Sequence, residues 1–159
     1  MNFPAEVTVS QLRAFLRLVC GSEETTHVHT VASELHMNLT RLLPILDAAE
    51  ILGLVTVEKG EIKRTKDGNN ACMRWESVPV MGGALSKVEP FTTALKFEKK
   101  FSGEDVAKKL SHKGIRWHHE NELNSLIVGE ILIRWGIRSG LFDYDGSVFT
   151  RKIRPDGSS

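Results

Sequence analysis

The stretch from Leu39 to Gly68, LTRLLPILDAAEILGLVTVEKGEIKRTKDG, constrains the fold more strongly than any other part of the chain. Its first half, capped by Thr40, repeats apolar residues at helical spacing and predicts an amphipathic helix. Gly53 suits the left-handed end of that helix, and a turn at Lys59-Gly60 then joins two short strands. The apolar positions are Leu42, Ile45, Leu46, Ala49 and Leu52.

The register of this predicted hairpin follows from its turn. Val57 is expected opposite Ile62, and Val55 opposite Arg64. One face of the hairpin is then apolar and packs on the helices, while the other carries polar residues such as Lys63.

The residues before this stretch complete a recognisable order of elements. Thr8 or Ser10 can cap a helix that runs to about residue 20 with an apolar face. His27 to His29 form a short extended piece, and Thr30 is expected to cap a second helix. Helix, short strand, helix, turn, helix, strand, wing and strand is the order of a winged helix-turn-helix.

The C-terminal half repeats this pattern more loosely. Ser102 is expected to cap a helix that ends at Gly114, and a strongly apolar helix starting at Asn121 or Asn124 should end at Gly140. A second hairpin follows around Asp145-Gly146, in which Phe142 is expected to face Phe149.

The fold class predicted from these patterns is mostly α with small β-hairpins (α+β), built as tandem winged helix-turn-helix units. Asp67-Gly68 is expected to break the strand, with a helix containing Cys72, Met73 and Trp75 after it. Another helix is expected from Lys87 to Phe101. The predicted domains are an N-terminal unit (1–76), a linker (77–86), a C-terminal unit (87–153) and a disordered tail (154–159).

Composition places few demands on function. A net charge of +1 gives no global attraction to nucleic acid or anionic lipid, so charged binding must be local. Cys20 and Cys72 are expected as buried, inert thiols, which fits a reducing compartment. Without a run of apolar residues of membrane-spanning length or a secretory signal, we expect a cytoplasmic protein with no membrane insertion.

Catalytic, cofactor and metal motifs give no positive signal in the sequence. The segment GGALSK (Gly82 to Lys87) lacks the spacing and the Lys-Ser/Thr ending of a phosphate-binding loop. The histidine pairs at 27/29 and 118/119 match no zinc spacing and are expected at the surface. We therefore expect no enzyme activity, no cofactor and no metal.

The third helix of a winged helix often reads DNA through its solvent face. Its expected exposed residues include one arginine against Asp47 and Glu50, which would repel phosphates. The wing is more basic, although Glu58 and Glu61 interrupt it. The predicted contact residues for a partner or nucleic acid are Arg41, Lys59, Lys63, Arg64 and Lys66.

Aromatic residues offer a second kind of candidate contact. The chain has three tryptophans, Trp75, Trp117 and Trp135. An exposed tryptophan is a candidate hot spot for protein binding, whereas a buried one belongs to the core.

Three segments together resemble a known family, the AAA-associated C-terminal domain that follows the ATPase in nitrate-, sulfonate- and taurine-type ABC importers. They are LLPILDAAEILGLV (42–55), KGEIKRTKDG (59–68) and WGIRSGLFDYDG (135–146). Arg64 stands where the family has leucine, and Arg138 to Gly140 depart from its ending. Because this sequence starts at Met1 with no ATPase before it, the resemblance implies an accessory or regulatory role and no catalytic residue.

Two functional hypotheses follow. The first is a non-catalytic module that binds a protein, an ABC transporter ATPase subunit, and so modulates uptake. The alternative is a winged-helix transcriptional regulator that binds DNA. A homo-oligomer is compatible with both.

Overall fold

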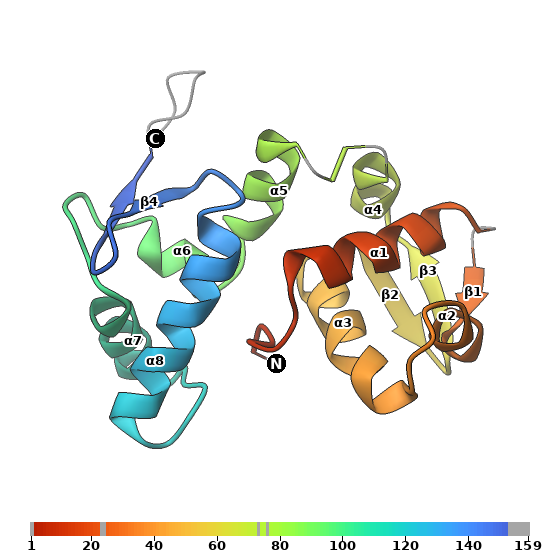
Figure 1. Ribbon diagram of the computed structural model, residues 1–159, viewed down its shortest axis with the longest axis horizontal. Helices are drawn as coiled ribbons and strands as arrows, with labels where there is room; N and C mark the ends of the chain where they lie inside the picture. Colours follow the sequence, from red (N-terminus) through yellow and green to blue (C-terminus); the bar gives the residue numbers. More distant parts are fainter. Residues whose placement is uncertain (1, 23–24, 73, 76, 153–159) are drawn as a thin grey trace. The chain divides into compact units, whose positions relative to one another are not determined.

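The computed structural model describes residues 2–22, 25–72, 74–75 and 77–152. The chain divides into two compact units, Phe3–Val80 and a second that begins at Met81. Each unit combines helices with one small antiparallel sheet, so the fold is mixed α+β as expected (Figure 1). The predicted tail, 154–159, lies outside the described residues.

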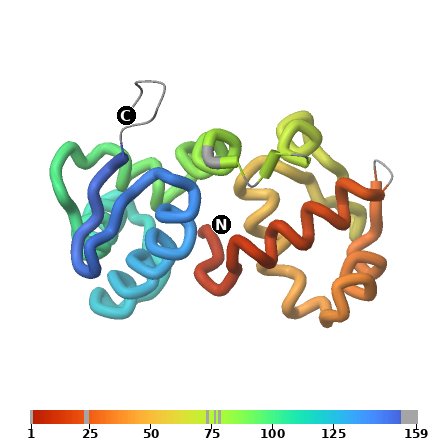
Figure 2. The backbone as a smooth tube through the Cα atoms, turned by 45° about the horizontal axis from the view of Figure 1, so that its top comes forward, coloured from red at the N-terminus to blue at the C-terminus, as the bar shows by residue number. Residues whose placement is uncertain are grey.

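The first unit places three helices around a three-stranded sheet, with a short helix after the last strand. In Figure 2 its first helix is the coiled red part of the tube. In chain order the elements are α1 (Val9–Cys20), β1 (Thr25–His27), α2 (Val28–Glu34), α3 (Leu39–Ile51), β2 (Val55–Glu58), β3 (Glu61–Arg64) and α4 (Lys66–Ala71).

Helix α1 begins where the sequence predicts. Thr8 and Gln11 form a capping box, in which each side chain accepts a hydrogen bond from the other's backbone N–H. Leu12 and Phe15 are fully buried on the inner face of the helix. The helical spacing of its apolar residues thus supplies part of the core of this unit.

The sheet has the strand order β1-β3-β2. Val57 pairs with Ile62 and Val55 with Arg64, which confirms the predicted register. Lys59 and Gly60 both take positive φ at the turn, and Gly53 has φ 74° at the end of α3.

The predicted caps of α2 and α3 were wrong by a few residues. Helix α2 starts after His27, whose Nδ1 accepts a hydrogen bond from the backbone N–H of His29, and not at Thr30. Helix α3 starts after Asn38, whose side chain accepts from Arg41 N, and not at Thr40. Several cap-forming residues lie near each start, and the turn before each helix selects among them.

Asp67-Gly68 lies inside α4, so the helix after the hairpin starts earlier than expected. Met73, which was expected in this helix, lies outside the described residues. Thr65 caps this helix by accepting from Gly68 N, and its hydroxyl donates to the carbonyl of Gly53 at 2.6 Å. A Cβ on Gly68 would lie 1.9 Å from the carbonyl oxygen of Leu54. Only glycine therefore lets α4 pack this closely against the end of α3.

The second unit has a helical pair covered at one end by a two-stranded hairpin. Helices α7 and α8 run side by side in Figure 1. The elements are α5 (Val78–Leu85), α6 (Phe91–Ala94), α7 (Gly103–His112), α8 (Asn121–Ile131), a π-helical turn η1 (Leu132–Gly136), β4 (Phe142–Tyr144) and β5 (Phe149–Arg151).

Helix α7 confirms the predicted start, because Ser102 and Asp105 form a capping box. A Cβ on Gly103 would come within 2.8 Å of Gly129 Cα, so the two helices approach at paired glycines. Gly114 and Gly140 take positive φ at the ends of their helices, as expected.

The second hairpin forms at the predicted turn but in a different register. Tyr144 pairs with Phe149, and Phe142 pairs with Arg151. Asp145 accepts hydrogen bonds from the backbone N–H groups of Val148 and then Ser147, which hold its pKa below the ordinary value. The turn is therefore longer than the predicted two-residue Asp145-Gly146 turn.

The boundary between the two compact units falls between Val80 and Met81, inside the predicted linker (77–86). This segment contains helix α5, in which Met81 and Leu85 are buried. The helix expected from Lys87 to Phe101 is reduced to α6. A cis peptide bond at Glu89-Pro90 precedes α6.

The glycines give a matched test of the packing of α4. Gly68→Ala should destabilise the first unit by at least about 2 kcal/mol, because its methyl group meets backbone. Gly83→Ala in α5, which has open space around it, should raise stability by about 0.5–1 kcal/mol. Urea unfolding followed by circular dichroism measures both. Equal effects of the two substitutions would contradict the close contact at Gly68.

Candidate interaction surfaces

The five residues predicted to contact a partner come from four places in the first unit. Arg41, Lys59, Lys63 and Lys66 are exposed, whereas Arg64 is half-buried. They lie on α3, the β2–β3 turn, β3 and the first turn of α4. Among them the structure brings Lys59 and Lys63 together in one hollow.

This hollow lies on the outer face of the sheet and has a volume of about 410 Å³. Two lysines face two glutamates in it, so the positive charge of the wing is balanced within the hollow. Long-range attraction of phosphate needs an excess of positive charge, which this surface does not hold. The lining residues are Thr25, Thr56, Glu58, Lys59, Glu61 and Lys63.

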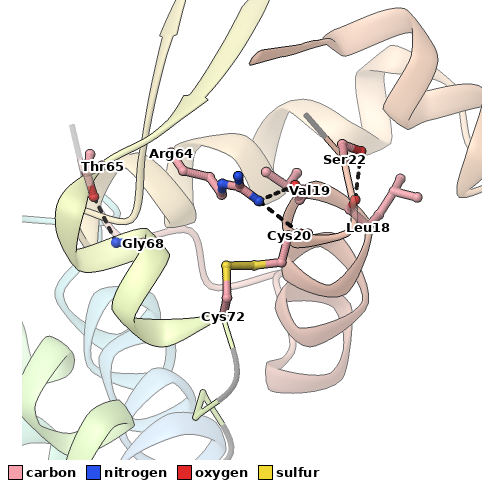
Figure 3. The surroundings of a disulfide bond; sticks show 8 residues. All are labelled: Leu18, Val19, Cys20, Ser22, Arg64, Thr65, Gly68 and Cys72. Carbon is pink, nitrogen blue, oxygen red and sulfur yellow. Dashed lines mark hydrogen bonds between the residues drawn. A yellow bond between two sulfur atoms is a disulfide. The ribbon is translucent and has the colours of Figure 1, made fainter. Parts of the chain in front are cut away.

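Arg64 has an internal structural role. Its Nη1 donates to the backbone carbonyls of Val19 and Cys20, both at 3.0 Å, as Figure 3 shows. These carbonyls belong to the last turn of α1. Carbonyl groups there have no N–H partner within the helix, and the negative end of the helix dipole favours a positive charge. The guanidinium therefore ties strand β3 to the C-terminal end of α1.

The expectation of two inert thiols was wrong, because Cys20 and Cys72 form a disulfide (Figure 3). Cys20 ends α1 and Cys72 ends α4, with their Cα atoms 5.6 Å apart. Their separation of 52 residues left no local signal of pairing in the sequence. The disulfide also removes the support that unpaired thiols gave to a reducing compartment.

A second surface, which the sequence analysis missed, lies in the second unit. It is a groove of about 840 Å³ between the start of α7, the length of α8 and the β4–β5 hairpin. Leu126 is 64% exposed and Ile133 is 38% exposed along it. We call this surface the α8 groove.

The α8 groove combines apolar side chains with acidic ones. Tyr144 and Phe149 stack at 4.5 Å between ring centroids and form its wall on the hairpin side. Gly103 and Gly129 line it where the two helices approach most closely. Its charged lining residues are Glu104, Glu122, Glu130 and Arg134.

Most of the tryptophan candidates belong to the core. Trp75 and Trp135 are buried, and Trp117 is half-buried.

The histidine pairs stack ring on ring, His27 on His29 and His118 on His119. Within the described residues no three His, Cys, Asp or Glu side chains converge as metal ligands.

The sequence of this chain also matches the sequence model of a known protein family. The model of the C-terminal AAA-associated domain matches residues 29–145, from α2 to the turn of the second hairpin. This span covers most of the 159 residues, so the chain belongs to the family of C-terminal AAA-associated domains. The match confirms the resemblance inferred from the three sequence segments.

Neither the curated proteins nor the solved structures that were searched contain a match to this chain. Among the residues that the structure describes, no helix is long and apolar enough to cross a membrane.

The disulfide should contribute strongly to the stability of the first unit. In the chain-entropy model, closing a loop of this size raises the free energy of the unfolded chain by about 4 kcal/mol. Adding a reductant should therefore lower the urea midpoint of this unit, and Cys20→Ser with Cys72→Ser should lower it similarly. The double variant should not respond to reductant, which serves as the control. An unchanged midpoint in the reduced wild type would contradict a stabilising disulfide.

Proposed function

We propose that this chain is a non-catalytic regulatory module that binds the ATPase subunit of a nitrate-, sulfonate- or taurine-type ABC importer. The family match over residues 29–145 carries this proposal. The description of the family as AAA-associated suggests an ATPase as the partner, and the three sequence segments that resemble the family lie in both units. The module would act by docking and would thereby change the rate of the ATPase.

The proposal includes an architecture of two winged-helix units. In the first unit, helices α1 to α3 and strands β1 to β3 follow the order of a winged helix. In the second, Phe101 makes an isolated antiparallel bridge to Phe149 just before α7, as β1 pairs with β3 just before α2. This shared order supports a repeat, with the β4–β5 hairpin as the second wing.

Protein binding is supported by large apolar side chains that remain exposed. Leu43 on α3 is 53% exposed, and the α8 groove adds Leu126 and Ile133. Burying such side chains against a partner lowers the free energy of the complex, because it removes apolar surface from water. The exposed surface therefore suits docking to a protein better than it suits attraction to a polyanion.

A cytoplasmic location is part of the proposal, because the ATPase subunits of importers work on that side of the membrane. There the Cys20–Cys72 disulfide would meet thiol reductants. The stability of the first unit, which holds Leu43, would then depend on the redox state.

A pull-down tests the proposed partner. The tagged full chain should retain a purified importer ATPase of the nitrate, sulfonate or taurine type and should change its ATP hydrolysis rate. An unrelated ABC exporter ATPase is the control. The proposal fails if neither binding nor a rate change is seen with the ATPases encoded in the same genome.

DNA binding is the second candidate, favoured by one observation. Arg41, Lys59 and Lys66 are exposed on the proposed recognition helix, wing and following helix of the first unit. In a winged helix these places face the DNA backbone and the major groove. Arg64, whose guanidinium is used inside the unit, would contribute little to such contacts.

A gel shift at low salt tests this alternative. If the chain binds duplex DNA, Lys59→Glu with Lys66→Glu should abolish the shift, because each change reverses a phosphate contact. Lys96→Glu with Lys99→Glu, at exposed positions of the second unit, is the control of equal charge change. A wild type without a salt-sensitive shift excludes DNA binding.

A further inference from the structure

We propose that the α8 groove binds a basic amphipathic helix of the partner protein. The inference rests on the proposed function, since it names the surface and the chemistry by which the partner would dock. It concerns the second unit alone, whereas the contact residues predicted from the sequence all lie in the first.

The apolar stripe of the groove fits a helix. Leu126 and Ile133 are seven residues apart, so they lie on one face of α8 and η1 about 10 Å apart along the axis. A helix with apolar side chains at positions i and i+7 presents the same spacing. Ile133 also lies in the π-helical turn, a feature often found at functional sites.

The charged residues around the apolar stripe favour a partner helix of positive charge. Three carboxylates and one guanidinium line the groove, and Arg134 pairs with Glu130 at 2.7 Å. Glu104 and Glu122 remain as an acidic pair in the first turns of α7 and α8. Lysine or arginine beside the apolar residues of the incoming helix would complement them, whereas nucleic acid and anionic lipid would be repelled.

The glycines at the floor of the groove offer a way to fill it. A Cβ on Gly129 would lie 3.9 Å from its nearest neighbour, Gly103 Cα, which is ordinary contact. Gly129→Ala should therefore fold normally and still reduce the depth of the groove. Gly103→Ala would meet Gly129 Cα at 2.8 Å and is unsuitable as a probe.

The test uses the full chain and a fluorescein-labelled synthetic peptide of 18 residues, built from leucine and lysine with one apolar face. Fluorescence anisotropy should show saturable binding that weakens with salt. Leu126→Gln, Ile133→Gln and Gly129→Ala should each weaken binding at least fivefold. Glu104→Gln with Glu122→Gln should weaken it similarly and reduce the salt dependence.

Leu43→Gln is the matched control, because Leu43 is as exposed as the groove residues but lies in the first unit. It should leave the affinity within twofold of wild type. A charge-reversed peptide with glutamate in place of lysine, and a scrambled peptide without an apolar face, should bind at least tenfold more weakly.

Three results would overturn the inference. The groove variants could bind like wild type, the glutamate peptide could bind as well as the lysine peptide, or the free chain could dimerise through this face. In the last case Leu126→Gln would turn a dimer into a monomer in sedimentation experiments. If groove variants still capture the importer ATPase, the inference fails and the proposed function stands; if the peptide binds but no ATPase does, the reverse holds.

Discussion

The close contact between the end of the third helix and the start of the fourth is the constraint on which the first unit depends. Gly68 lies against the carbonyl of Leu54, and Thr65 bridges the carbonyl of Gly53 and the first turn of α4. The hairpin between them must then return to this point. The second unit uses the same device at Gly136, where a Cβ would lie 2.5 Å from the ring of Phe142. In each unit a glycine permits packing that any side chain would block.

Much of this fold could be predicted because its signals are local. The caps at Thr8 and Ser102 bind residues three positions away, and the strands of the first hairpin are joined by a short turn. Sequence spacing therefore predicts these helix starts and this register. The second hairpin differed because Asp145 organises a longer turn through its side chain, which shifts every strand pair. The disulfide could not be predicted, since it joins residues that only the completed fold brings together.

The candidate surfaces were less accessible to sequence reasoning, because exposure depends on the whole unit. Arg64 was predicted as a contact residue because of its charge, yet its guanidinium donates to backbone carbonyls at the end of α1. Leu126 belonged to an apolar helix, yet it faces a groove. A net charge of +1 also averages two unlike surfaces, a balanced hollow in the first unit and an acidic groove in the second.

The exposed face of α8 is not needed for the stability of its own unit. Val128, Ile131 and Trp135 are fully buried and anchor α8 and η1 to the core from the opposite side. Leu126 gains little from folding, since most of its surface stays in water. A polar residue at this position would cost the fold little, so packing inside the unit does not require leucine there. Substitutions at Leu126 would therefore test the proposed binding without unfolding the unit.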